Sequence, residues 1–101
     1  MSDKIDTFDG PHVRFARSAT RHRISKDCIR HVIANYRVRF EESPPETEGA
    51  RARATRIVYV GDDDRGRALE VMAIDGERGE LLVIHAMTLR ERYRKLYEDR
   101  R

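Results

Sequence analysis

Three apolar segments in the second half of the chain, joined by two short links, constrain the fold more than any other feature. The segments are residues 56–61, 67–75 and 81–87, and each link, 62–66 and 76–80, contains glycine. The middle segment alternates apolar and polar residues, whereas the outer two are apolar at nearly every position. Short glycine-containing links are typical of hairpin turns, which join antiparallel strands. The sequence therefore predicts an antiparallel meander of three strands.

Helical signals precede the meander. Residues 15–22 are compatible with a short helix. Ser25 is a favourable N-cap residue, and the apolar residues of 26–36 recur at helical spacing, which predicts an amphipathic helix. A short strand is expected at 38–42, followed by a loop at 43–53 that is rich in proline, glutamate and alanine. The helix at 26–36 has to bury its apolar face against the sheet.

The end of the chain has the pattern of a closing helix. Its apolar face is formed by Leu89, Tyr93, Leu96 and Tyr97. The order of elements predicts a small single α+β domain with N-terminal helices, an antiparallel meander of three to four strands and a C-terminal helix. We assign residues 1–14 to a flexible arm and 15–101 to one domain, because a chain of 101 residues holds a single core. We expect the helices to share one sheet face and to leave the other partly open.

The charged residues are unevenly distributed along the chain. Lysine and arginine outnumber aspartate and glutamate by 21 to 18, and the basic residues concentrate in 14–39, 51–56 and 90–101. Basic patches attract polyanions because each neutralised phosphate releases counterions. Nucleic acid, either RNA or DNA, is therefore an expected partner, and a solvated charged surface is the alternative.

The composition argues against several other classes of protein. Cys28 is the single cysteine, so neither an internal disulfide nor a multi-cysteine zinc site can form. The four histidines lack zinc-site spacing, the acidic run 62–64 lacks the length of a calcium loop, and the glycines do not form a phosphate-binding loop. We therefore expect no metal and no cofactor. The apolar runs are too short to span a membrane and the acidic N-terminus is unlike a signal peptide, which predicts a cytoplasmic protein without membrane contact.

Three segments, taken in this order and spacing, resemble the BrnT-like toxin family. They are Arg-His-Arg-Ile-Ser at 21–25, Gly-Arg-Ala-Leu-Glu-Val at 66–71 and Val-Ile-His-Ala-Met-Thr-Leu-Arg at 83–90. Tyr-Val-Gly at 59–61 and Tyr-Glu at 97–98 stand at matching places. The resemblance covers about residues 15 to 98.

This resemblance implies a RelE-class fold and a ribonuclease that blocks translation without a metal or organic cofactor. It also implies a type II toxin–antitoxin pair, in which a DNA-binding antitoxin protein neutralises the toxin. The chain departs from the family pattern at Met87, where the family has arginine, and at Tyr93, where it often has glutamate. Arg90, three residues beyond Met87, is a candidate to replace the missing arginine.

RNA cleavage without a metal requires a base for the 2′-hydroxyl, an acid for the leaving 5′-oxygen and fixed positive charge around the phosphorus. Histidine titrates near neutral pH and arginine keeps its charge, so these two residue types are the ones to seek. The candidate catalytic residues are His85, Arg67 and Arg90. The candidate nucleic-acid-binding residues are Arg21, His22, Arg23 and Arg94.

Each catalytic candidate has a structural alternative. His85 lies in an apolar strand, where packing and one hydrogen bond would account for it. Arg67 begins a strand and would equally pair with a carboxylate such as Asp64 or Glu70. Glu70 is itself a candidate general base, and we expect it to be exposed to solvent because it alternates with apolar neighbours.

The binding candidates are open to a second interpretation as well. Arg90 and Arg94 share a helix face near a helix N-terminus, where backbone N–H groups favour phosphate, or they form a solvated face. The basic residues at 21–23 precede a capped helix and favour non-specific phosphate contact over catalysis. A non-catalytic nucleic-acid-binding or protein-interaction module on the same fold therefore remains the alternative to the ribonuclease.

Overall fold

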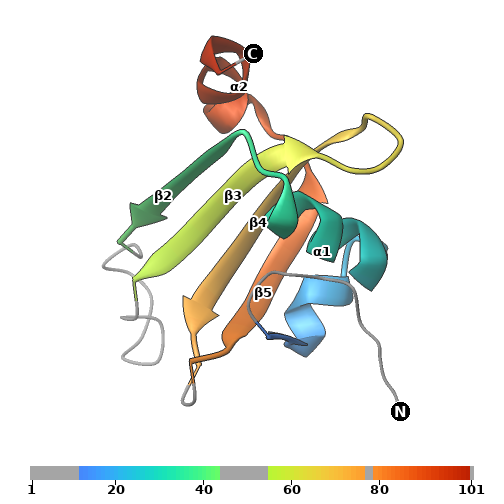
Figure 1. Ribbon diagram of the computed structural model, residues 1–101, viewed down its shortest axis with the longest axis vertical. Helices are drawn as coiled ribbons and strands as arrows, with labels where there is room; N and C mark the ends of the chain where they lie inside the picture. The colour runs from blue at the N-terminus through green and yellow to red at the C-terminus, as the bar shows by residue number, and fades with distance from the viewer. Residues whose placement is uncertain (1–11, 44–54, 77–78, 101) are drawn as a thin grey trace.

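A five-stranded sheet forms the centre of the structure, a computed structural model that describes residues 12–43, 55–76 and 79–100 (Figure 1). The strands are β1 (Val13–Phe15), β2 (Val38–Glu42), β3 (Arg56–Asp62), β4 (Ala68–Asp75) and β5 (Leu81–Thr88). They lie in the order β1-β5-β4-β3-β2 across the sheet. The helices are the 3-10 helix η1 (Arg17–Thr20) and the α-helices α1 (Lys26–Ala34) and α2 (Glu91–Asp99).

The predicted meander is confirmed, and with it the α+β class. β3 pairs antiparallel with β4, β4 pairs antiparallel with β5, and β2 adds antiparallel to the other side of β3. Gly66, in the β3–β4 turn, has φ +82°, a conformation that glycine adopts without a steric penalty. The predicted loop at 43–53 falls almost entirely outside the described residues, with Ser43 as its one described member.

The N-terminal edge of the sheet differs from the prediction. β1 runs parallel to β5, with Val13 opposite Leu81, so the sheet is mixed and has five strands instead of an antiparallel three to four. Three residues are too few to show strand alternation in a sequence, which is why this strand was missed. The first part of the predicted arm, residues 1–11, lies outside the described residues.

The helix expected at 15–22 is reduced to the single turn of η1. Phe15 is already part of β1, and the Ser18 hydroxyl donates a hydrogen bond of 2.6 Å to the Ile84 carbonyl oxygen of β5. This bond ties η1 to the β5 side of the sheet. The turn that follows η1 is consequently held beside β5.

Helix α1 covers one face of the sheet, as its apolar pattern predicts. The Ser25 side chain caps it by accepting a hydrogen bond of 3.1 Å from the Cys28 backbone N–H. Its buried residues Ile29, Val32 and Ile33 share a core cluster with Ile57, Tyr59, Leu69, Val71, Ala73 and Val83. The helix ends at Ala34, so Tyr36 lies beyond it, is 45% exposed and packs its ring on Tyr59.

Helix α2 lies at the end of the sheet and packs against the opposite face (Figure 1). Leu89 and Tyr93 are buried there with Val38, Val58, Val60 and Met72. The expectation that the helices share one face is therefore wrong. Because α2 covers only the end of the sheet, Leu96 is 42% exposed. No helix among the described residues is long and apolar enough to cross a membrane.

Candidate functional site

A pocket of about 580 Å³ opens on the sheet face that α2 covers only at one end. Met72 of β4 and Ile84 of β5 provide apolar surface from the sheet. The walls are rich in positive charge, contributed by Arg21, Arg56, Arg90 and Arg92. His22 and His85 also line the pocket, and Glu42 is the carboxylate on its wall. The pocket therefore combines titratable groups, fixed positive charge and an apolar surface.

A β-bulge in β5 aims His85 into this pocket. His85 pairs with Met72 and Val83 pairs with Ala73, so Ile84 is an extra residue without a partner on β4. Val83 packs in the core under α1, whereas Ile84 packs in the cluster on the other face. His85, opposite Met72, shares that second face. The bulge thus places two consecutive side chains on the pocket side, as bulges beside functional sites do.

Glu70 lies beneath the pocket and holds its polar groups together. The side chain is fully buried, although solvent exposure was predicted. Its Oε1 accepts a hydrogen bond of 2.8 Å from the Arg90 backbone N–H, and its Oε2 accepts bonds from Arg90 Nε at 2.8 Å and Nη2 at 2.6 Å. His85 Nε2 lies 3.2 Å from the same Oε2 atom. The prediction failed because Arg90, the N-cap residue of α2, covers this carboxylate.

The contacts of Glu70 determine its charge. Burial raises the pKa of a carboxylate, but the hydrogen bonds from His85 and Arg90 outweigh burial and lower the pKa of Glu70 to about 2. Glu70 is therefore ionised at neutral pH. An ionised carboxylate only accepts hydrogen bonds, so the hydrogen that His85 shares with Glu70 resides on Nε2.

A second histidine, His22, contacts His85 at the pocket. The rings of His22 and His85 meet edge to face, with their centroids 5.7 Å apart. His22 belongs to the turn after η1, which the Ser18 hydrogen bond holds against β5. Arg21 precedes it and lines the same pocket. Arg21 and His22 of this turn, His85 of β5 and Arg90 at the start of α2 were all predicted as site residues, and the fold brings them together at one pocket.

The other three predicted residues lie elsewhere. Arg67 donates from Nε to Asp63 Oδ2 at 2.9 Å, in the β3–β4 turn. Arg23 and Arg67 line a separate pocket of about 510 Å³ near the start of α1. Arg94 lies on α2, where its Nε is 3.8 Å from Glu91. Arg67 therefore pairs with a carboxylate, as its structural alternative predicted, and the carboxylate is that of Asp63.

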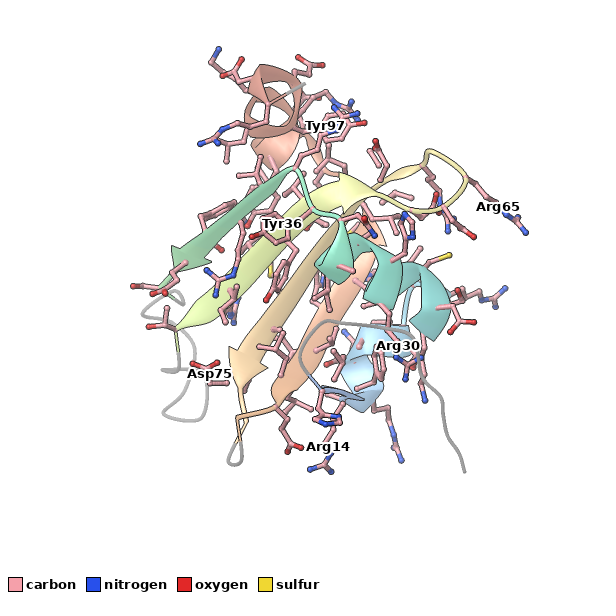
Figure 2. All side chains as sticks on the ribbon, viewed as in Figure 1. Arg14, Arg30, Tyr36, Arg65, Asp75 and Tyr97 are labelled. Carbon is pink, nitrogen blue, oxygen red and sulfur yellow. The ribbon has the colours of Figure 1, made fainter. Side chains whose placement is uncertain are left out.

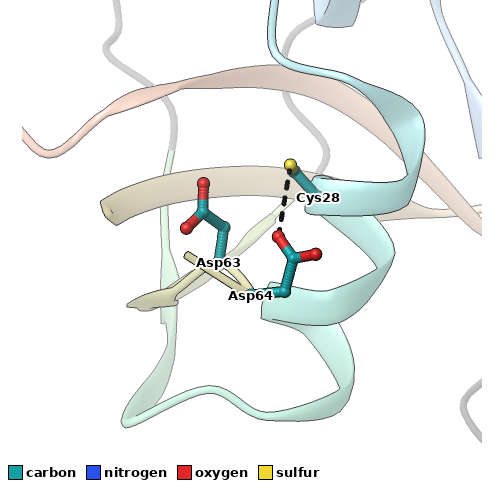
Figure 3. Close-up of side chains that lie close together, drawn as sticks. All are labelled: Cys28, Asp63 and Asp64. Carbon is teal, nitrogen blue, oxygen red and sulfur yellow. Dashed lines mark hydrogen bonds between the residues drawn. The ribbon is translucent and has the colours of Figure 1, made fainter. Parts of the chain in front are cut away.

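The β3–β4 turn also carries the one candidate metal cluster among the described residues. Cys28, Asp63 and Asp64 place their ligand atoms within 4.8 Å of one another, and Cys28 Sγ is 4.0 Å from Asp64 Oδ1 (Figure 3). Asp63, however, already accepts hydrogen bonds from the backbone N–H groups of Arg65 and Arg67 and from the Arg67 guanidinium.

Burial raises the pKa of Asp63, but these three donors together keep it below its ordinary value. The carboxylate is thus ionised and engaged by this chain's own donors. A metal ion would have to displace Arg67, so these residues suit a turn better than a metal centre. Arg65, at the tip of the same turn, extends away from the body of the protein (Figure 2).

Glu42 is a pocket residue that sequence reasoning missed, as are Arg56 and Arg92. It lies at the end of β2, and its two carboxylate oxygens accept hydrogen bonds from the Tyr93 hydroxyl at 3.1 and 3.0 Å. Arg92 Nη2 donates to it at 3.3 Å. Burial and the adjacent Glu42 raise the pKa of Tyr93 to about 12, so Tyr93 keeps its proton at neutral pH. A glutamate at the end of a short strand carries no signal that distinguishes it from a surface residue.

Comparison of the chain with protein-family models, with curated proteins and with solved structures finds no match. The chemistry of the pocket is therefore assigned from its own geometry.

Proposed function

We propose that the protein is a metal-independent endoribonuclease. The observation that carries this proposal is the hydrogen-bonded set of Glu70, His85 and Arg90, with His22 in contact with His85 in an arginine-lined pocket. Two imidazoles and several guanidinium groups can supply the base, the acid and the positive charge that RNA transphosphorylation requires.

His85 acts as the general base in this reaction. Glu70 keeps the hydrogen of neutral His85 on Nε2, which leaves the Nδ1 lone pair to accept the proton of the 2′-hydroxyl. The 2′-oxygen then forms a bond to phosphorus while the bond from phosphorus to the 5′-oxygen breaks. Protonated His22 donates a proton to the departing 5′-oxygen. The products are a 2′,3′-cyclic phosphate and a 5′-hydroxyl, so the step needs neither a metal nor water.

Arginine side chains stabilise the charge that develops on the phosphoryl oxygens. Arg90 uses Nε and Nη2 on Glu70, and its side chain remains 39% exposed, so its other donors are available to the pocket. Arg21 supplies a further fixed charge from beside His22. The Glu70 contact orients Arg90 before substrate binds, which lowers the cost of reorganisation during the reaction.

The proposal extends to a role as the toxin of a type II toxin–antitoxin pair with a BrnT-like or RelE-class fold. The resemblance at 21–25, 66–71 and 83–90 supports this role, because these three segments contribute His22, Glu70, His85 and Arg90. Met87, at the position of the family arginine, lies directly opposite Glu70 in the β4–β5 pairing. Arg90 contacts Glu70 instead, which supports its substitution for the arginine that the chain lacks. A DNA-binding antitoxin is the partner this role requires.

Cleavage of a labelled, unstructured RNA in the presence of EDTA tests the proposed activity. We expect wild-type protein to release products with cyclic phosphate ends, and His85→Ala to lower the rate by about 100-fold or more. His31→Ala is the matched control, because His31 lies on α1 at the opposite face, and it should cleave like the wild type. Intact RNA with every protein, on translating ribosomes as well, would refute the endoribonuclease.

The arginine-lined pocket also supports a second candidate, a non-catalytic nucleic-acid-binding module. Four arginines around one pocket favour phosphate binding whether or not a bond is cleaved. RNA binding that weakens steeply with salt, without cleavage and without any effect of His85→Ala on affinity, is the outcome that favours this module.

A further inference from the structure

We propose that Glu42 recognises a guanine base, so that the enzyme cleaves RNA preferentially on the 3′ side of guanosine. This inference rests on the proposed endoribonuclease function and names the nucleotide that its pocket accepts. It starts from the placement of a carboxylate on the wall of an otherwise basic pocket.

A carboxylate in a phosphate-binding pocket needs an explanation. Glu42 carries a charge that repels phosphate, and it shares the pocket with Arg56, Arg90 and Arg92. Its side chain is 25% exposed, so it retains contact with solvent and with any ligand in the pocket. A carboxylate in this position suits a part of the substrate that presents hydrogen-bond donors. In RNA these donors are the ribose 2′-hydroxyls and the base edges, and only a base edge presents two adjacent donors.

The neighbours of Glu42 hold it in one orientation. The Tyr93 hydroxyl bridges both carboxylate oxygens and Arg92 contacts Oε2. Tyr93 is 3% exposed and its pKa is raised to about 12, so this donor keeps its place and its proton. Two carboxylate oxygens offer about four acceptor positions, so acceptor capacity remains after these contacts.

Guanine matches two carboxylate oxygens better than the other bases do. Its N1–H and N2–H₂ groups are adjacent donors that reach both oxygens together. Adenine and cytosine each present one amino group beside a ring nitrogen that accepts, and uracil presents one N–H between two carbonyl groups. A paired contact of this kind discriminates between bases by roughly 5- to 150-fold.

The apolar surface of the pocket that contains Glu42 suits the flat faces of a base. Met72 and Ile84 line the pocket from β4 and β5, and both pack in the cluster on this face of the sheet. Ile84, the extra residue of the β5 bulge, lies on the same face as His85. Methionine makes favourable contacts with aromatic rings. A base on Met72 and Ile84 would bring its own ribose toward the histidine pair.

Four dinucleoside phosphates with guanosine, adenosine, cytidine or uridine on the 5′ side test the inference. We expect wild-type kcat/KM to be at least about tenfold higher for the guanosine substrate, and Glu42→Gln to abolish most of this preference. The glutamine amide oxygen still accepts from Tyr93, so the fold should persist. Glu41→Gln is the matched control, because Glu41 is exposed, adjacent and on the other face of β2, and it should keep the guanine preference.

The outcomes separate this inference from the activity on which it rests. Cleavage of all four substrates at similar rates, or a guanine preference that survives in Glu42→Gln, overturns the role of Glu42 and leaves the ribonuclease intact. Failure to cleave any substrate or longer RNA overturns the ribonuclease instead. In that case, the affinities of guanosine and adenosine 3′-monophosphate for wild type and Glu42→Gln decide the base contact, and equal affinities refute it.

Discussion

Replacing Glu70 by glutamine should remove a defined part of the acid dependence of stability. Glu70 is fully buried, and its pKa falls from 4.5 to about 2 in the folded protein. A shift of this size corresponds to about 3 kcal/mol of unfolding free energy, at roughly 1.4 kcal/mol for each pKa unit. Because the folded pKa is the lower one, this stabilisation is present above pH 4.5 and is lost as the pH falls toward 2.

The expected difference between the two proteins therefore depends on pH. At pH 7, the free energy of unfolding of Glu70→Gln should be about 3 kcal/mol lower than that of the wild type, because the variant lacks the charge that His85 and Arg90 contact. Near pH 2, where Glu70 becomes protonated and resembles glutamine in charge and size, the two proteins should converge. Urea unfolding at pH 7, 5, 4 and 3 measures this convergence.

A surface carboxylate provides the control for this experiment. Glu91→Gln removes the charge of a side chain that is 92% exposed, and the free energy of unfolding of this variant should follow that of the wild type at each pH within about 0.5 kcal/mol. If the difference in free energy of unfolding between Glu70→Gln and the wild type stayed constant from pH 7 to pH 3, the contacts of Glu70 would not lower the pKa of its carboxylate. The assignment of Glu70 as an ionised group that orients His85 would then fail.

Two further substitutions test the site and the fold. Arg90→Ala should lower the RNA cleavage rate by about 100-fold, whereas Arg67→Ala should leave it unchanged because Arg67 lines a different pocket. Equal effects of the two substitutions in the same assay would contradict this assignment of the arginines. Ser25→Ala removes the N-cap of α1 and should lower the unfolding free energy by about 1 kcal/mol in urea titrations, and an unchanged midpoint would show that the cap contributes nothing.

Local patterns in the sequence predicted much of the fold. The glycine-containing links and apolar segments predicted the β3–β4–β5 meander, and Ser25 with its helical stripe predicted α1. β1 was missed because three residues show no periodicity, and its parallel pairing with β5 depends on contacts distant in sequence. The sequence also did not predict which sheet face α2 covers, because the direction that the chain takes after β5 depends on tertiary packing.

The candidate site was predicted less completely than the fold. Residue chemistry was enough to select His85, Arg90, His22 and Arg21, which the structure places around one pocket. The same reasoning also selected Arg67, which lies at a different pocket. The sequence does not distinguish a strand-end arginine that pairs with a carboxylate in a turn from one that faces a substrate. The burial of Glu70 and the place of Glu42 depend on α2, whose position no local pattern encodes.

The β5 bulge connects the stability of this face to its proposed chemistry. With regular alternation beyond Val83, His85 would fall on the α1 side, among the buried core residues, and Glu70 would lose one of its hydrogen-bond donors. Each donor lost from a buried carboxylate is costly, so the bulge that places the His85 imidazole at the pocket also supplies a hydrogen-bond donor to Glu70. The same carboxylate thus stabilises the fold and fixes the proton on His85 Nε2. Substitutions at Glu70 should therefore reduce stability and cleavage together, whereas substitutions at Glu42 should alter base preference with little change in stability.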